Sequence, residues 1–415
     1  MKKIAVVGGG ISGLSSAQLL KDQFQVKLFE KASRPGGLIK CDIVNGNLYH
    51  MVGGHVFNSK REDVLEFFWK FFDREIEFTK SIRNAVVQFD KPVSYPIENH
   101  LDQFDPEITQ NVIRDLISLK NKDIQDYDNF EEFLIGRFGE TLYNLYFKPY
   151  NEKIWKQDLS KVPLEWLEGK LPMPSVEQIL FDNIKKKEES NMVHSTFYYP
   201  IKEGSQFLAD RLAREVDIEY DAPIETLEYL DGKWLINQTQ EYDIVVYSGN
   251  IKMLPKILRG NIINKYTEEI GTLDSHGTTT VLVEIDSNDY SWIYLPNIEY
   301  DAHRIICTGN FAKSNNAPGI LSATLEFTGS ISKNDILEQL KKVPLSPKYI
   351  AHQYTEYTYP TQNKNTRHLI SSLKGVLEKN HMYLVGRFAE WEYFNMDAAI
   401  GSAIDTAKRI IADND

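Results

Sequence analysis

Short, continuous hydrophobic runs alternate with helical patterns in several parts of this chain. Residues 3–7 (KIAVV) are such a run, residues 25–29 (QVKLF) are predicted as a second strand, and apolar residues at helical spacing lie between them. Residues 242–247 and 382–387 have the same character, and a helix is predicted from about 396 to 411. Buried strands that alternate with helices predict a parallel sheet covered on both faces.

In other stretches of the chain the hydrophobic residues recur with different spacing. Residues 100–190 have helical spacing: Asp105 and Pro106 predict a helix start, and Val112, Leu116 and Leu119 form one stripe. Residues 175–178 (SVEQ) have the form of a capping box before another helix. From about 262 to 360 the pattern changes to short alternating runs at 278–285, 292–295, 304–308 and 321–327. These runs predict an antiparallel sheet, with residues 85–95 as a candidate further strand.

The first two strands carry a dinucleotide-binding fingerprint. Gly8 would make the turn, Gly10 would let the backbone approach a pyrophosphate, and Gly13 would allow close helix–strand packing. Glu30, at the end of the second strand, is placed to accept from a ribose hydroxyl. Because strand, helix, second strand and acid occur in register, the fingerprint strongly predicts a Rossmann-type domain.

Length and charge narrow the class of protein. A chain of 415 residues predicts two or three domains. The net charge of −12 repels nucleic acid and anionic membrane, so an anionic ligand would need a local cationic pocket. Cys41 and Cys307 offer neither a disulfide framework nor a metal spacing, and no run is long enough to span a membrane. We expect a cytoplasmic protein without a metal site.

Residues 49–58 (YHMVGGHVFN) contain an unusual Gly53-Gly54-His55 triplet. A strand does not need two glycines before a histidine, so either the backbone runs close to a ligand or the imidazole faces one. A structural histidine remains the alternative. Gly36 and Gly37 follow the second strand in a loop that could close over a flavin dinucleotide.

Several separated motifs resemble the UDP-galactopyranose mutases, a branch of the flavoproteins that include amine oxidases and protoporphyrinogen oxidases. They are GGHVF at 53–57, YFKPYNEKIW at 146–155, WIYLP at 292–296, TYPT at 358–361 and GRFAEWEYFNMD at 386–397. The last motif is the most specific, because flavin oxidases in general do not carry it. The resemblance implies FAD as the cofactor. It also implies an α/β fold with a discontinuous Rossmann-type FAD-binding domain, a helical domain and an antiparallel β-sheet domain.

The resemblance implies a nucleotide-sugar substrate and an isomerase that interconverts the pyranose and furanose forms of the sugar. Reduced FAD would act as a nucleophile through N5 at the anomeric carbon while the nucleoside diphosphate leaves. Arg304 is the candidate to grip that diphosphate. Lys170 stands where the family places a second arginine, and Asn395 stands where bacterial members have an aspartate. For that reason the sugar is not assigned.

The resemblance implies three groups of site residues. The catalytic candidates are His55, Arg304 and Lys170. The substrate-binding candidates are Trp155, Tyr294, Tyr359, Tyr393 and Asn395. The cofactor-binding candidates are Gly8, Gly10, Ser12, Gly13, Glu30, Lys31, Gly36, Gly37, Gly53, Gly54, His55, Gly386, Arg387 and Met396.

The expected domains are interleaved along the chain. Residues 1–80, 195–260 and 375–415 are assigned to the FAD-binding domain, 100–190 to the helical domain, and 81–99 with 261–374 to the substrate domain. The competing functions are an oxidase or desaturase of the amine oxidase or protoporphyrinogen oxidase type and a non-enzymatic FAD-binding protein. The base, the reductant (NAD(P)H is a candidate) and a homo-oligomeric state stay open.

Overall fold

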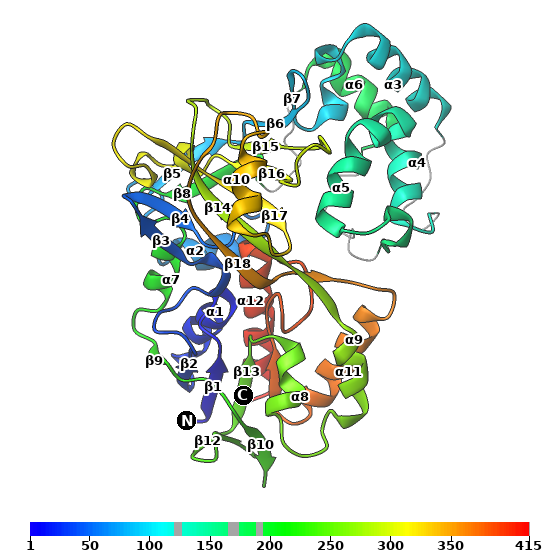
Figure 1. The fold of residues 1–415 in the computed structure, drawn as a ribbon. Helices are drawn as coiled ribbons and strands as arrows, with labels where there is room; N and C mark the ends of the chain where they lie inside the picture. The colour runs from blue at the N-terminus through cyan, green and yellow to red at the C-terminus, as the bar shows by residue number, and fades with distance from the viewer. Residues whose placement is uncertain (120–126, 165–173, 188–193, 415) are drawn as a thin grey trace.

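The computed structural model describes residues 1–119, 127–164, 174–187 and 194–414. Figure 1 shows a lower part that contains both termini, an antiparallel-rich sheet above it, and a lobe of helices at the upper right. The long strands β14 (Asp274–Ile285) and β18 (Lys348–Thr361) run from the upper sheet down into the lower part. The mixed α/β architecture confirms the predicted fold class.

The lower part is built on a parallel sheet of five strands in the order β19-β13-β1-β2-β9. All four neighbouring pairs are parallel. Its strands come from three separated stretches of the chain, as the sequence predicted. The bounds are β1 Lys3–Val7, β2 Gln25–Phe29, β9 Asp217–Glu219, β13 Ile244–Tyr247 and β19 Met382–Leu384.

Both faces of this sheet are covered, which explains the continuous hydrophobic runs of β1 and β13. Ile4 and Val6 face a core shared with α1 (Ile11–Leu20) and α12 (Met396–Ala412). Ala5 and Val7 face a second core on the other side. Since successive side chains of a strand point to opposite faces, a strand covered on both sides needs apolar residues at every position. The same second core contains residues of α11 (Thr366–Glu378).

The upper sheet has seven strands in the order β18-β14-β17-β16-β15-β6-β7. It is antiparallel except where β6 pairs with β15 in parallel. The predicted strands are confirmed, including the candidate segment at 85–95, but β18 was not recognised as one long strand. The remaining bounds are β15 Trp292–Tyr294, β16 Arg304–Ile306, β17 Leu321–Thr328, β6 Ala85–Gln88 and β7 Pro92–Ser94.

The helical lobe confirms the helical pattern in the described parts of residues 100–190. Helix α3 (Pro106–Ser118) begins after Asp105, as predicted, and buries Val112 and Leu116. The Ser175 side chain caps α6 (Val176–Lys185) by accepting from the Gln178 amide at 3.2 Å. The Gln178 side chain binds Asp182 instead, at 2.6 Å, so the predicted capping box is only half formed. The other helices here are α4 Phe130–Leu142 and α5 Lys148–Trp155.

Smaller elements complete the fold. Two-stranded sheets join β3 to β4 and β5 to β8, and a three-stranded sheet joins β10, β11 and β12. Within the described ranges, no helix combines the length and the apolar character needed to cross a membrane. The small strands are β3 Cys41–Val44, β4 Asn47–His50, β5 Phe78–Ile82, β8 Thr196–Pro200, β10 Leu227–Leu230, β11 Lys233–Ile236 and β12 Gln240–Tyr242. The remaining helices are α2 Glu62–Trp69, α7 Gln206–Leu212, α8 Leu254–Ile257, α9 Thr267–Thr272 and α10 Lys333–Leu340.

Candidate functional site

The turn between β1 and α1 has the tight geometry that the fingerprint predicts. Gly8 has a φ of +104°, which L side chains rarely adopt. A Cβ added to Gly13 would lie 1.9 Å from the Gly8 carbonyl oxygen. Gly10 is the N-cap of α1 and makes no side-chain cap hydrogen bond. The first turn of the helix can therefore offer its backbone N–H groups to an anion.

Glu30 fixes this turn from the end of β2. Its side chain is buried, and its two oxygens accept from the amides of Gly9 at 2.6 Å and Ala32 at 2.9 Å. The carboxylate also lines the cavity above the turn. An acid in this position can hold the turn and still present oxygen atoms to a ribose.

A cavity of about 600 Å³ opens above the turn, at the carboxyl ends of β1, β2 and β13. This is where open α/β sheets bind their ligands. The glycine cradle, the uncapped helix start and the buried acid all fit a dinucleotide. The predicted cofactor residues that line this cavity are Gly8, Gly10, Ser12, Glu30, Lys31, Gly36, Gly37, His55, Arg387 and Met396.

Two further predicted glycines do not line this cavity but allow other backbone to pack closely against the turn. Gly13 packs against Gly8, as described above. Gly386 has a φ of +93°, and a Cβ there would lie 2.2 Å from the Ser12 hydroxyl oxygen. The start of the last segment therefore lies directly against the start of α1.

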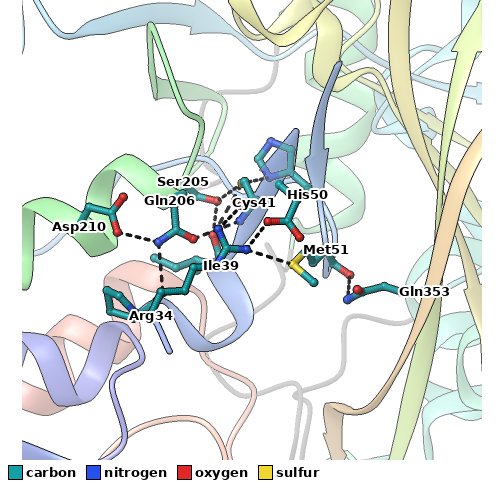
Figure 2. A network of polar contacts seen from close by, with 11 residues as sticks. Arg34, Ile39, Cys41, His50, Met51, Ser205, Gln206, Asp210 and Gln353 are labelled. Carbon is teal, nitrogen blue, oxygen red and sulfur yellow. Dashed lines mark hydrogen bonds and ion pairs between the residues drawn. The ribbon is translucent and has the colours of Figure 1, made fainter. Parts of the chain in front are cut away.

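A buried polar network anchors the loop at residues 34–41 beside this cavity (Figure 2). The Gln206 side chain donates to the Pro35 carbonyl at 3.1 Å and accepts from the Cys41 amide at 3.4 Å. Ser205 donates to a backbone carbonyl of the same loop at 2.7 Å. These bonds tie the loop to the start of α7, so the backbone that lines the cavity is held in one position.

The Gly-Gly-His triplet lies where the chain crosses beneath the upper sheet. A Cβ on Gly53 would lie 2.5 Å from a Glu326 carboxylate oxygen, and one on Gly54 would lie 2.7 Å from the Ile306 side chain. His55 Nε2 donates to the Leu38 carbonyl at 3.0 Å. Burial, and then the nearby Arg387 charge, lower the pKa of His55 to about 4. The imidazole is therefore neutral at pH 7, and both glycines are required by close packing.

A second cavity, of about 220 Å³, lies under the upper sheet. Residues that line both cavities are His55, Arg387, Asn395 and Met396. The other predicted residues that line the second cavity are Gly53, Gly54, Tyr294, Arg304, Tyr359 and Tyr393. The two cavities are thus adjacent, and most of the predicted substrate residues meet in the second one.

Arg304 is oriented by a buried acid on the neighbouring strand. Register places Arg304 of β16 opposite Glu326 of β17, and the Arg304 Nε donates to the Glu326 carboxylate. The Arg304 Nη2 donates to the Tyr359 hydroxyl at 2.8 Å. His303 Nε2 lies 3.4 Å from the same carboxylate. Burial alone would raise the pKa of Glu326, but Arg304 and His303 hold it at about 2, so the acid stays ionised.

Arg387 is held beside Tyr359 and Tyr393. Its guanidinium donates to the Phe394 carbonyl at 2.8 Å and to the Thr358 carbonyl at 3.0 Å. It lies 4.9 Å from the ring centre of Tyr393, and that ring stacks on Tyr359 at 5.5 Å. Arg387 therefore joins the cofactor cavity to the tyrosine pair.

One predicted residue lies outside both cavities. Trp155 lines neither cavity, although its ring lies 6.1 Å from His276, which stacks on Tyr359 at 5.4 Å. Lys170 lies outside the described residues. Sequence reasoning missed Glu326 and Arg83, which also line the second cavity, because neither belongs to a motif.

Comparison with known proteins finds a dinucleotide-binding domain and similarity to sugar mutases. The model of the NAD(P)-binding Rossmann-like domain matches residues 6–72. A dTDP-fucopyranose mutase of Escherichia coli is 23% identical over 430 residues, covering 100% of both chains. A UDP-galactopyranose mutase of Mycoplasma genitalium is 22% identical, covering 99% of this chain and 95% of that one.

The chain resembles the nucleotide-sugar mutases along its whole length. A crystal structure of reduced UDP-galactopyranose mutase superposes with a TM-score of 0.87, covering 99% of this chain and 96% of that one at 19% identity. The resemblance predicted from the motifs is confirmed, and so are the fold class and the expected isomerase class.

Proposed function

We propose that this protein interconverts the pyranose and furanose forms of a nucleotide sugar. The observation that supports it best is the lining of the second cavity. Three arginines and three tyrosines line that cavity, directly beside a cavity that fits a dinucleotide. A guanidinium and phenolic hydroxyls are donors suited to a diphosphate that gains negative charge as it leaves.

We further propose that the dinucleotide is FAD. When bound and reduced, FAD would supply a nucleophile, its N5, for the anomeric carbon of the sugar. The glycine turn and the start of α1 would hold its pyrophosphate, and Glu30 would hold the adenosine ribose. His55, neutral and fixed to the Leu38 carbonyl, lines both cavities and would hold the flavin edge that faces the sugar.

Arg304 is the central diphosphate ligand in this proposal. Its Nε donates to Glu326, which fixes the plane of the guanidinium. The two terminal nitrogens are then directed at the cavity and at Tyr359. A guanidinium held in this way loses little entropy when it binds phosphate oxygens. Glu326 therefore acts as a positioning residue for Arg304.

The tyrosines would bind the same phosphates as neutral donors. The Tyr359 hydroxyl accepts from Arg304, so its own hydrogen can be donated to a phosphate oxygen. Burial raises the pKa of Tyr359, so the phenol keeps that hydrogen at neutral pH. Tyr294 and Tyr393 line the same cavity. Trp155 would form an aromatic wall for the sugar or the base, and Asn395 would face the substrate without adding negative charge.

The remaining assignments rest on the resemblance. We propose Lys170 as a second cation for the diphosphate and NAD(P)H as the reductant of the flavin. A nucleotide sugar is the expected partner, and a reducing cytoplasm suits Cys41 and Cys307, which are buried and free.

The test is an isomerisation assay under controlled redox state. FAD-loaded protein is reduced with dithionite under anaerobic conditions and incubated with a panel of nucleotide hexopyranoses. We expect an isomer of unchanged mass, many turnovers for each electron pair, and no conversion by the oxidised protein. Stoichiometric flavin reduction by a substrate, without isomerisation by reduced protein, would instead indicate an oxidase or desaturase.

A further inference from the structure

A buried lysine of the helical lobe holds the turn that joins β15 to β16. Lys153 lies on α5, and its side chain is buried, although lysine is almost always solvated. Its Nζ donates to three backbone carbonyls, those of Leu295 at 2.8 Å, Asn297 at 2.5 Å and Ala302 at 3.2 Å. All three carbonyls belong to the turn of residues 295–303 between the two strands. One side chain of the lobe therefore fixes the backbone of a turn in the upper sheet.

An ammonium suits this position because it has three N–H donors. Its nitrogen also lies 4.7 Å from the ring centre of Tyr300, in the same turn, so the positive charge faces an aromatic ring. Burial lowers the pKa of Lys153 to about 7, and the Asp301 charge acts in the opposite direction. Even as a neutral amine the side chain keeps two N–H donors and can hold two of the carbonyls. Lys153 thus fastens the turn in either protonation state.

The turn has a residue of the second cavity at each end. Tyr294 comes directly before it and Arg304 directly after it, and strand register places the two opposite each other. The Leu295 amide donates to the His303 carbonyl at 2.9 Å, which closes the turn beside this pair. Leu295 is next to Tyr294, and Ala302 is two residues before Arg304. Because Lys153 holds both of these carbonyls, a shift of the turn away from the lysine would move both cavity residues.

The same helix contacts the turn and its flanking residues one helical turn earlier. Tyr150 of α5 lies edge-on to Tyr294, with 5.4 Å between the ring centres, and its ring centre is 6.5 Å from that of His303. His303 lies 3.4 Å from Glu326, the acid that orients Arg304. The helical lobe and the upper sheet, which are distinct parts of the fold in Figure 1, therefore meet where α5 packs against this turn.

We propose that Lys153 is a positioning residue for Arg304 and Tyr294. It fastens the turn between them to the helical lobe, which holds the Arg304 guanidinium and the Tyr294 hydroxyl in place for a diphosphate. The inference rests on the proposed function, because the ligand of Arg304 comes from it. It links the helical lobe to substrate binding through a lysine that lines neither cavity.

The test measures diphosphate affinity separately from cofactor binding. UDP, or dTDP if wild-type protein binds it more tightly, is titrated calorimetrically into oxidised, FAD-loaded protein. Lys153→Met keeps the apolar stem but removes every N–H donor. It should weaken binding by about 10-fold, because Arg304 and Tyr294 must then be ordered by the ligand itself. The amount of FAD bound per chain, measured by absorbance, should not change.

Two variants separate this role from a general effect on folding. Lys153→Arg restores cationic N–H donors and should recover most of the lost affinity. Lys252→Met is the matched control, because Lys252 also donates to a backbone carbonyl, that of Leu273, but lines neither cavity. It should change UDP affinity by no more than about twofold, as expected for an independent site. If Lys153→Met does not fold, Lys153→Gln replaces it, with a smaller expected loss of about threefold because its amide keeps two N–H donors.

A further pair of variants tests whether Lys153 acts through Arg304. Arg304→Lys keeps the charge but loses the planar fork whose orientation depends on the turn. Adding Lys153→Met to this variant should therefore weaken UDP binding by no more than about threefold, instead of about 10-fold. A loss of equal size in both backgrounds would show that the two residues act independently.

The outcomes distinguish this inference from the function on which it rests. The inference is wrong if Lys153→Met binds UDP as tightly as Lys252→Met, or if its effect persists in the Arg304→Lys background. It is also wrong if Lys153→Met loses FAD together with UDP affinity, or if Lys153→Arg binds UDP no better than Lys153→Met. In each of these cases the proposed function stands, because wild-type protein still binds the diphosphate. If wild-type protein binds neither UDP nor dTDP, the proposed function fails as well.

Discussion

The two adjacent cavities are built by different means. The dinucleotide cavity is formed mainly by backbone: glycines that permit close approach, helix amides without side-chain caps, and an acid that binds the turn. The second cavity, the proposed substrate site, is formed by side chains from different strands, such as Tyr294, Arg304 and Tyr359. The first depends on a short local sequence. The second depends on strand register and on how the parts of the fold pack.

This difference predicts two kinds of failure. A change in the glycine turn should abolish cofactor retention through sterics, whatever its charge. A change in the substrate cavity should act through charge and hydrogen bonding, so a second change that restores charge balance should recover folding without recovering function. Variants at the two cavities test that division.

Replacing Gly13 by valine should give protein without bound dinucleotide. Even a Cβ there would lie 1.9 Å from a backbone oxygen, which cannot move as a flexible side chain can. Absorbance of the purified protein and its melting temperature measure the effect. Gly375→Ala is the control: Gly375 is exposed on helix α11 and nothing lies within 4 Å of the added Cβ, so stability should rise by about 0.5–1 kcal/mol. A yellow, normally stable Gly13→Val protein would contradict the assignment.

Removing Arg304 should destabilise the protein as well as abolish turnover. Arg304→Met leaves the Glu326 carboxylate buried without its main partner, and breaking such a pair costs about 3–5 kcal/mol. The double variant with Glu326→Gln should recover much of that stability, measured by denaturant unfolding, yet stay inactive. Recovery of both stability and activity would show that Arg304 is structural only.

The contrast between local sequence and strand packing also explains which parts of the structure the sequence could predict. The strands β1 and β2 occur at the predicted bounds because both are covered on two faces, and that burial makes β1 continuously apolar after Lys3 and leaves only Gln25 and Lys27 polar in β2. The strand β18 was missed because it is mostly half-exposed and contains a proline near its end. Its neighbour β14 carries two register shifts against it, which further disturb any simple alternation.

The same contrast holds for the residues of the two cavities. Glycine spacing identified the turn, because the requirement for close backbone approach is local. Glu326 and Arg83 were not found, because their importance comes from partners on other segments: Arg304 across a strand pair, and the rings of Tyr95 and Trp292. Motif resemblance brought together Arg304 and the tyrosines, which no periodicity of this chain indicates.

Acid should weaken the fold partly through His55, which lies between the two cavities. Its pKa falls from 6.5 to about 4 on folding, so the folded state binds a proton less readily than the unfolded chain. The contribution to stability is complete above pH 6.5 and is lost progressively as the pH falls towards 4. His55→Gln should therefore show a smaller drop in melting temperature between pH 7 and 5 than wild-type protein. An equal drop would mean that other buried groups, such as His50, determine the acid response.

The smallest effect is expected at Asn395, where the two cavities meet. Asn395 is the N-cap of α12, and its side chain makes no cap hydrogen bond. Asn395→Asp would place a negative charge at a helix N-terminus, which should stabilise the fold by about 0.3–1 kcal/mol. The same charge would face the anionic substrate across a cavity lined by Arg304 and Arg387, so diphosphate affinity should fall a few-fold, and less in high salt. Melting temperature and UDP titration should thus move in opposite directions, whereas Asn395→Ala, without the charge, should leave UDP affinity nearly unchanged. If aspartate strengthens UDP binding instead, position 395 acts by orienting a neighbouring donor, and the electrostatic account of this cavity is wrong there.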